Sequence, residues 1–175
     1  MLMFTDKVAV VTGGASGIGK IICYELRRNN AKVCIIDIKD NDYFVGDIAD
    51  EKTLISFADK VKAEYGNIDF LINNAAPPMG GLDDYSYYDF NYALKVGVSS
   101  AFMLTKLFKD SFNQGGSIIN ISSTRARMSQ ANTESYSAAK GAISALTHAL
   151  AVSLSGKVRV NSISPGWIET QDAEH

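Results

Sequence analysis

Short apolar runs alternate with helix-period segments along this chain. Runs rich in valine and isoleucine predict buried parallel strands, and longer stretches with apolar residues every three or four positions predict helices. The expected strands lie near residues 7–12, 32–37, 43–46, 68–72, 116–122 and 158–163. The expected helices lie near residues 17–29, 51–65, 91–112 and 135–154. This alternation predicts an α/β fold, a doubly wound parallel sheet with helices on both faces.

Composition sets mild limits on this picture. The chain has 175 residues, 46% of them hydrophobic, and a formal net charge of −2. That is enough apolar material for one core, so we expect a single domain over residues 1–175. The near balance of charge argues against nucleic acid or an anionic membrane as a partner. No apolar stretch reaches membrane-spanning length and no secretory signal opens the chain, so we expect a cytoplasmic protein.

The two cysteines and the histidines suggest no metal site. Cys23 falls on the packing side of the first predicted helix and Cys34 inside the second predicted strand. We expect both to be reduced core residues rather than a disulfide or a metal pair. No cluster of histidine, cysteine and aspartate has metal-ligand spacing, so no metal is expected.

A glycine-rich turn joins the first strand to the first helix. Gly13, Gly17 and Gly19 occupy it, with Ser16 and Ile18 between them. Glycines let the backbone turn tightly and approach a bound pyrophosphate, and a helix N-terminus favours that anion. A strand before the turn and a helix after it are the context that such a motif requires. The turn therefore predicts a dinucleotide site.

An acidic residue at the end of the second strand indicates which dinucleotide. Asp37 stands eighteen residues after Gly19 and can accept hydrogen bonds from the adenosine ribose hydroxyls. Its carboxylate would repel the extra phosphate of NADP. The following residue, Ile38, is not basic, although Lys39 is close. We therefore expect NAD(H) rather than NADP(H).

Three polar residues further along can carry out a carbonyl reaction. Tyr136 and Lys140 stand four residues apart, which places them on one face of a helix. The ammonium favours the phenolate form of the tyrosine, which suits it to acid/base work. Ser123, thirteen residues before the tyrosine, supplies a hydroxyl that can bind the substrate oxygen. The adjacent Ser122 is a substitute candidate for that role.

Seven segments together resemble the short-chain dehydrogenase/reductase family. They follow the family's order and spacing, and they cover residues 7 to 170. The segments are TGGASGIG (Thr12–Gly19), Asp37, GDI (Gly46–Ile48), NNAA (Asn73–Ala76), GSIINISS (Gly116–Ser123), YSAAK (Tyr136–Lys140) and VRVNSISPGWIET (Val158–Thr170). The resemblance implies a Rossmann-like fold and hydride transfer between NAD(H) and a secondary alcohol or ketone, with Ser123, Tyr136 and Lys140 as catalytic residues.

The resemblance also implies a cofactor shell. Lys140 would hold the nicotinamide ribose, beside Tyr136. Asp47 and Ile48 would flank the adenine. Asn73 and Ala75 would lie under the cofactor, and Asn73 would also tie neighbouring strands together. The residues expected to border the nicotinamide are Pro165, Gly166, Ile168 and Thr170.

Two departures from the family pattern affect the expected activity. Gly97 stands where relatives carry an asparagine that is thought to hold a proton-relay water. We expect a slower or re-routed relay and faster turnover in a Gly97→Asn variant. Either the extra space admits another water, or Ser99 or Ser100 compensates. Relatives also run to about 250 residues. We therefore expect a fold that lacks the usual last strand and C-terminal helix, with residues 158–163 as an edge strand and the substrate-covering segment missing.

Function and assembly follow as expectations with an alternative. The leading hypothesis is an oxidoreductase that resembles 3-oxoacyl reductases or polyol and sugar dehydrogenases. The alternative is a catalytically weak NAD-binding module or partner subunit. Small residues on the helix over 135–154 permit close approach of a second copy, so we expect a homodimer through this helix and the one over 91–112. The loop over 77–81 either borders the substrate or is a plain connection.

Overall fold

Six parallel strands form one sheet in the computed structural model, which describes residues 3–170. The strand order is β3-β2-β1-β4-β5-β6. This order reverses direction at β1, between β2 and β4, so the carboxyl ends of β1 and β4 open a crevice where ligands bind in such sheets. The strands are β1 Val8–Thr12, β2 Lys32–Asp37, β3 Phe44–Val45, β4 Ile68–Asn73, β5 Phe112–Ile121 and β6 Val158–Ile163.

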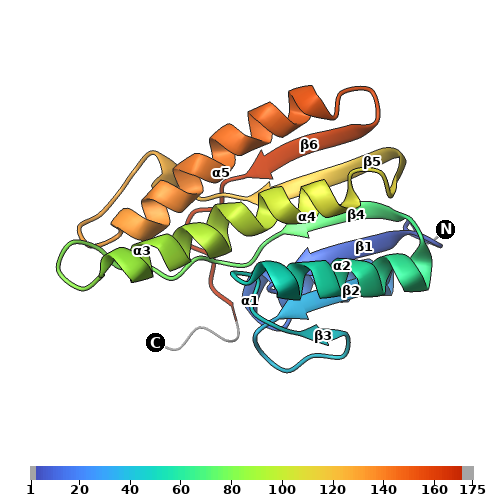
Figure 1. Ribbon diagram of the computed structural model, residues 1–175, viewed down its shortest axis with the longest axis horizontal. Helices are drawn as coiled ribbons and strands as arrows, with labels where there is room; N and C mark the ends of the chain where they lie inside the picture. Colours follow the sequence, from blue (N-terminus) through green and yellow to red (C-terminus); the bar gives the residue numbers. More distant parts are fainter. Residues whose placement is uncertain (1–2, 171–175) are drawn as a thin grey trace.

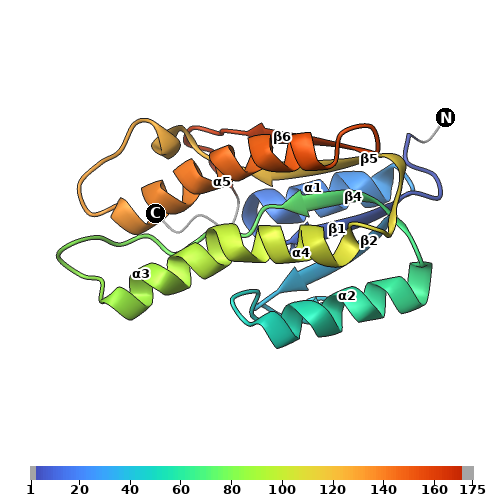
Figure 2. The ribbon, with the colours of Figure 1, turned by 45° about the horizontal axis from the view of Figure 1, so that its top comes forward.

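Helices cover both faces of this sheet, as predicted. Figures 1 and 2 show α1 on one face, and α2, α4 and α5 on the other. The helices are α1 Gly17–Arg28, α2 Glu51–Tyr65, α3 Tyr87–Leu94, α4 Ser100–Phe108 and α5 Glu134–Ser153, with a π-helical segment Lys95–Ser99 and a 3-10 turn Thr124–Ala126. The domain expected over 1–175 includes residues 1–2 and 171–175, which lie outside the described residues.

Two apolar layers hold the sheet between its helices. Under α2, α4 and α5, the largest fully buried side chains include Phe57, Phe108 and Leu104. On the α1 side the layer is smaller, and Cys23 packs there against β1 and β2 residues such as Ile35. Cys23 and Cys34 belong to different layers, both are free and buried, and burial raises the pKa of each thiol to about 11. Their predicted role as reduced core residues is confirmed.

The helix predicted over 91–112 is wrong in its bounds and its continuity. Helix α3 begins at Tyr87 because Ser86 and Asp89 form a reciprocal capping box. The π-helical segment then interrupts the helix, and α4 ends at Phe108. Strand β5 begins at Phe112, four residues before the predicted strand, and its pairing with β4 shifts register early in the strand. Sequence periodicity did not reveal these changes, since both depend on contacts with distant parts of the chain.

The connection from β2 to β3 and the edge position of β6 agree with the sequence. Strand β3 has only two residues and follows β2 without a helix. Strand β6 pairs with β5 alone and stands at one end of the strand order. Within residues 3–170, no helix is long and apolar enough to cross a membrane.

Candidate active site

Three of the four glycines in the glycine-rich turn have different structural roles. Gly13 adopts φ +66°, and a Cβ there would lie 2.8 Å from the Ala75 Cα. Gly19 lies against the turn itself, because its Cβ would lie 2.0 Å from the Gly13 carbonyl oxygen. Gly17, with φ +53°, has nothing nearer to an added Cβ than the Thr170 hydroxyl at 4.0 Å. The turn is therefore closed toward the sheet and open toward the cavity, which is the shape that a pyrophosphate requires.

The turn is fixed to the loop that follows β4. The Thr12 hydroxyl oxygen accepts hydrogen bonds from the Asn74 and Ala75 N–H groups, at 3.0 and 3.1 Å. The Asn74 amide donates in return to the carbonyl oxygens of Thr12 and Gly13, at 3.1 and 2.9 Å. These bonds join the carboxyl ends of β1 and β4. Sequence reasoning missed Asn74, although the paired asparagines at 73–74 were a visible signal.

The Asp37 carboxylate lies at the carboxyl end of β2 and beside the glycine-rich turn. One oxygen accepts a hydrogen bond from the Ala15 N–H at 2.9 Å, and the other accepts one from the Lys39 N–H, also at 2.9 Å. The residue is only 8% exposed, so its orientation is set by these backbone donors. Asp37 also lines a cavity shared with the glycine-rich turn, where its oxygens can take further donors such as ribose hydroxyls.

Asp47 stands on the other side of this pocket and is held by a tyrosine. The Tyr92 hydroxyl donates to one carboxylate oxygen at 3.0 Å, and the Ala49 N–H donates to the other at 2.8 Å. This arrangement connects α3 to the end of β3. Sequence reasoning missed Tyr92, which lines the cavity together with Asp47 and Ile48.

The three predicted catalytic residues meet at the same cavity. The Lys140 Nζ lies 5.4 Å from the centre of the Tyr136 ring and donates to the Ile121 carbonyl oxygen at 2.7 Å. Lys140 is 3% exposed, and this burial lowers the pKa of its ammonium to about 8. The Ser123 oxygen accepts a hydrogen bond from the Arg125 N–H at 3.1 Å, so its own hydrogen can be donated to a carbonyl oxygen.

Ser122 does not share the environment of Ser123. Its hydroxyl donates to the Lys140 carbonyl oxygen at 2.9 Å and lies 2.8 Å from the Ser144 hydroxyl. These contacts tie the end of β5 to helix α5. Ser122 therefore fixes the strand against the helix that carries Tyr136, and Ser123 is the better candidate for contact with a substrate.

The space expected at Gly97 is filled. A Cβ on Gly97 would lie 2.8 Å from the Ala139 Cβ and 3.1 Å from the Pro77 Cγ. Gly97 lies in the π-helical segment, a form that often occurs at functional sites. The Ser100 hydroxyl donates to the Val96 carbonyl oxygen at 2.7 Å, so it satisfies part of the altered backbone there. The expectation of extra room for a water is therefore wrong.

The loop after β4 is held in place at the start of α5. Ser135, which is fully buried, donates to the Gly80 carbonyl oxygen at 2.8 Å and accepts from the Gly80 N–H at 3.1 Å. Since Ser135 precedes Tyr136, the loop is fixed beside the proposed acid/base. Pro78 lines the cavity, which favours the first of the two interpretations of residues 77–81.

One cavity of about 620 Å³ brings nearly all the predicted site residues together. Gly19 and Asn73 are the exceptions. Gly19 packs inside the turn, and the Asn73 amide donates to the Asn120 side chain at 2.8 Å, which ties β4 to β5. The predicted residues that do line the cavity are Gly13, Ser16, Gly17, Ile18, Asp37, Asp47, Ile48, Ala75, Ser123, Tyr136, Lys140, Pro165, Gly166, Ile168 and Thr170.

Comparison with known proteins agrees with this arrangement. The family profile described as short chain dehydrogenase matches residues 7–175. An oxidoreductase of Thermotoga maritima is 38% identical over 97% of this chain and 74% of its own length. The cis-4-hydroxycyclohexanecarboxylate dehydrogenase of Sinomonas cyclohexanicum is 32% identical over 95% of this chain and 75% of its own length.

A solved structure supports the fold as well. Ligand-free aldohexose dehydrogenase of Thermoplasma acidophilum aligns with a TM-score of 0.90 at 27% identity, over 97% of this chain and 70% of that one. The relatives are longer than the 175 residues of this chain. With the glycine turn, the Ser-Tyr-Lys group and these similarities in agreement, the chain belongs to the short-chain dehydrogenase family and is an oxidoreductase that acts on CH–OH groups.

Proposed function

We propose that this protein is an NAD(H)-dependent dehydrogenase that interconverts a secondary alcohol and a ketone. The observation that carries the proposal is that Asp37, the glycine turn and Tyr136 all line one cavity. Its size lies within the usual range for sites of small ligands and cofactors. When bound, a nicotinamide cofactor supplies or accepts the hydride; the residues of this chain bind it, orient the substrate and move the proton.

Each catalytic side chain has one task at the substrate oxygen. Ser123 donates its hydroxyl hydrogen to this oxygen and stabilises the negative charge that develops there during reduction. Tyr136 donates its phenolic proton to the same oxygen during reduction and accepts it during oxidation. The Lys140 ammonium, 5.4 Å from the centre of the phenol ring, favours the phenolate that remains after proton donation.

NAD(H) is the proposed cofactor, in preference to NADP(H). Members of this family use NAD(P), and Asp37 bears on the choice between the two. Its carboxylate is buried at the carboxyl end of β2, where it suits the hydroxyls of an adenosine ribose and repels a phosphate at that position. Titration with NADH and with NADPH, followed by cofactor fluorescence, measures the preference. Tighter binding of NADPH would contradict this assignment.

The proposed substrate carries its hydroxyl on a six-membered ring. Aldohexoses in their cyclic form and 4-hydroxycyclohexanecarboxylate share this feature, and dehydrogenases named for these compounds resemble this chain. The resemblance is why we favour a sugar-type or cyclic alcohol over a 3-oxoacyl thioester. A panel of aldohexoses, substituted cyclohexanols and acetoacetyl thioesters, assayed at the NADH absorbance band, tests the choice. Turnover of the thioester alone would overturn it.

Replacement of Tyr136, the proposed acid/base, tests whether the protein is an enzyme or only a binding module. Tyr136→Phe should abolish turnover and leave NADH binding within about twofold, because only the hydroxyl is lost. Ser123→Ala should lower turnover by roughly 10²-fold, the usual effect of one oxyanion donor. Two results together would support the catalytically weak module instead. In these, wild type binds NADH but turns over none of the tested alcohols, and Tyr136→Phe has no effect.

A homodimer is the proposed assembly. Phe102 on α4 is 51% exposed and Val152 on α5 is 79% exposed, so both helices present apolar side chains to solvent. Helix α5 also exposes small residues such as Ala138 and Ala145. A second copy of the chain would cover this surface.

A cytoplasmic location remains our prediction.

A further inference from the structure

The connection from β2 to β3 is too short to contain a helix, yet it carries part of the cofactor site. Residues 38–43 alone separate Asp37 from Phe44. A crossover between parallel strands usually needs a dozen or more residues. Asp37, Ile38 and Lys39 all line the same cavity as the glycine-rich turn. Something other than a packed helix must therefore hold these residues in position.

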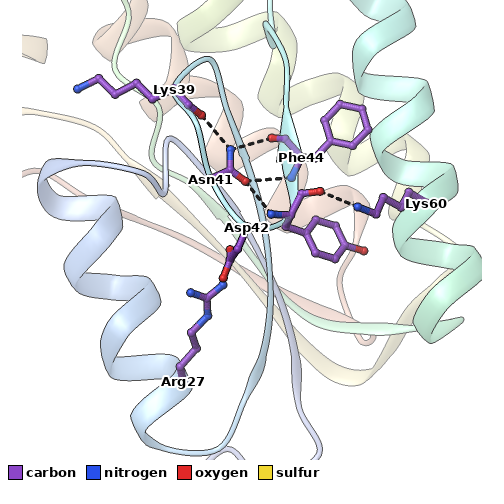
Figure 3. Close-up of polar contacts among 7 residues, drawn as sticks. Arg27, Lys39, Asn41, Asp42, Phe44 and Lys60 are labelled. Atoms are coloured by element: carbon purple, nitrogen blue, oxygen red, sulfur yellow. Dashed lines mark hydrogen bonds and ion pairs between the residues drawn. The ribbon is translucent and has the colours of Figure 1, made fainter.

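One side chain, Asn41, makes four hydrogen bonds across this loop. Its amide nitrogen donates to the Lys39 and Phe44 carbonyl oxygens, both at 3.0 Å. Its amide oxygen accepts from the Tyr43 N–H at 3.0 Å and the Phe44 N–H at 2.9 Å. Figure 3 shows this amide between the two sides of the loop. Both donors and both acceptor positions are used, so the amide is fully satisfied in one orientation.

The other contacts of the loop come from Asp42 and Tyr43. The Tyr43 ring packs edge-on against Phe57, and its hydroxyl donates to the Glu64 carboxylate at 3.0 Å. The Arg27 guanidinium pairs with the Asp42 carboxylate at 2.8 Å, and Lys60 donates to the Tyr43 carbonyl oxygen at 2.6 Å, as Figure 3 shows. These contacts tie the loop to α1 and α2. Both side chains of the ion pair are largely exposed, and exposed pairs stabilise little. Asn41 is thus the side chain whose hydrogen bonds connect Lys39, at the start of the loop, with Tyr43 and Phe44 at its end.

The effect of Asn41 reaches the cofactor site through Lys39. Asn41 binds the carbonyl oxygen of Lys39, and the N–H of the same residue donates to the Asp37 carboxylate at 2.9 Å. Asn41 therefore restrains the residue whose N–H orients one carboxylate oxygen. The other oxygen is oriented from the glycine turn by the Ala15 N–H. Loss of Asn41 would leave Asp37 with one fixed donor.

We propose that Asn41 is a positioning residue for the adenosine end of the cofactor, acting through Lys39 on Asp37. This inference rests on the proposed NAD(H) function and names a residue that the family motifs do not include. Asn41 touches neither the catalytic group nor the nicotinamide side of the cavity. Its loss should therefore weaken cofactor binding and leave the chemical step unchanged.

Calorimetric titration with cofactor fragments tests this role. The ligands are NADH, ADP-ribose, which carries the adenosine half, and reduced nicotinamide mononucleotide, which does not. Asn41→Ala should raise the dissociation constants of NADH and ADP-ribose by about tenfold, the equivalent of one or two lost hydrogen bonds. Binding of the mononucleotide should not change. The KM for NADH should rise by the same factor, with kcat at saturating NADH unchanged.

A second variant separates positioning from a merely structural role. Asn41→Asp keeps an acceptor for the Tyr43 and Phe44 N–H groups but loses the donor to the Lys39 and Phe44 carbonyl oxygens, so it should weaken ADP-ribose binding nearly as much as alanine. The titration is done at 0.5 M salt, where the added charge is screened. Asp42→Ala, which removes only the exposed ion pair, is the matched control and should bind ADP-ribose within about twofold of wild type. Asn41→Asp decides the question if Asn41→Ala does not fold.

The outcomes distinguish this inference from the proposed function. If wild type binds NADH and Asn41→Asp binds ADP-ribose as tightly as wild type does, positioning through Lys39 is wrong and the proposed function stands. Equal weakening of ADP-ribose and the mononucleotide would indicate general damage and also overturn it. If wild type binds neither NADH nor NADPH, both proposals fail.

Discussion

Gly97 and Ala139 pack so closely that a Cβ added to Gly97 would lie 2.8 Å from the Ala139 Cβ. Ala139 is fully buried on α5 and directly precedes Lys140. The absence of a side chain at Gly97 thus lets the π-helical segment pack against the helix that carries Lys140, the proposed catalytic lysine. Because Ala139 has no flexible side chain to move aside, any larger residue at 97 must shift the backbone.

Substitution of Gly97 should therefore reduce both stability and turnover. Gly97→Ala should lower the free energy of unfolding by about 1–3 kcal/mol, the usual cost of overpacking, in spite of the better helix propensity of alanine. Gly97→Asn should cost at least as much and turn over more slowly, contrary to the expectation from sequence. Urea unfolding and steady-state kinetics measure the two effects.

A second substitution provides the control for this clash. Ala139→Gly removes the opposing Cβ, so in a double-mutant cycle it should recover about 1 kcal/mol or more of the loss caused by Gly97→Ala. Additive effects of the two changes would show that the close contact does not set the cost. Faster turnover by Gly97→Asn with unchanged stability would restore the original expectation.

The buried ammonium of Lys140 should make stability depend on pH. Burial lowers its pKa from 10.5 to about 8, so between these values the unfolded chain binds more protons than the folded chain. The free energy of unfolding should therefore rise as the pH increases from 8 to 10.5, by on the order of 3 kcal/mol from this residue. Below pH 8 the lysine is charged in both the folded and the unfolded state, so it does not make the free energy of unfolding depend on pH.

Comparison with Lys140→Met isolates that contribution. Methionine fills a similar volume without a titrating group, and the other groups that titrate in this range are common to both proteins. The difference in unfolding free energy between wild type and variant, measured at intervals from pH 7 to pH 10.5, should change only above pH 8. A difference that stays constant with pH would show that the lysine has its ordinary pKa.

Trp167 should report cofactor binding directly. It is the only tryptophan in the chain, is 91% exposed and lines the cavity beside Gly166 and Ile168. Addition of NADH should quench its emission by energy transfer, and burial by the cofactor should shift the remaining emission to shorter wavelength. Trp167→Phe should abolish the signal and leave the dissociation constant from cofactor fluorescence nearly unchanged. If NADH saturates the protein without any change in tryptophan emission, the ligand binds outside the cavity that Trp167 lines.

A charge on the exposed face of α4 should disrupt the proposed dimer. Phe102→Asp places a carboxylate where a second copy would pack, so sedimentation should show a shift from dimer to monomer. Tyr24→Asp is the matched control, because Tyr24 is a 61% exposed aromatic residue on α1, on the opposite face of the sheet. If the dimer persists in Phe102→Asp and dissociates in Tyr24→Asp, the interface lies on the α1 face.

Most of the fold could be predicted because local patterns agree with it. The strand runs at 32–37 and 158–163 match β2 and β6, and the glycine turn lies between β1 and α1 as its sequence context required. The first and last residues of α3 and the first residue of β5 could not be predicted in this way. The π-helical segment and the register shift near Phe70 have no periodic signal, since they arise where distant segments pack together.

The sequence by itself determined which residue types meet at this site, because motif spacing fixes which of them stand at the carboxyl ends of the strands and on one turn of α5. Only the tertiary structure decided how these residues are held. Asn74 holds the glycine turn, Asn41 holds the β2–β3 loop, and Ala139 packs against Gly97. No sequence motif pairs the residues that make these contacts. Such contacts depend on distances of a few ångströms, which packing sets and residue order does not.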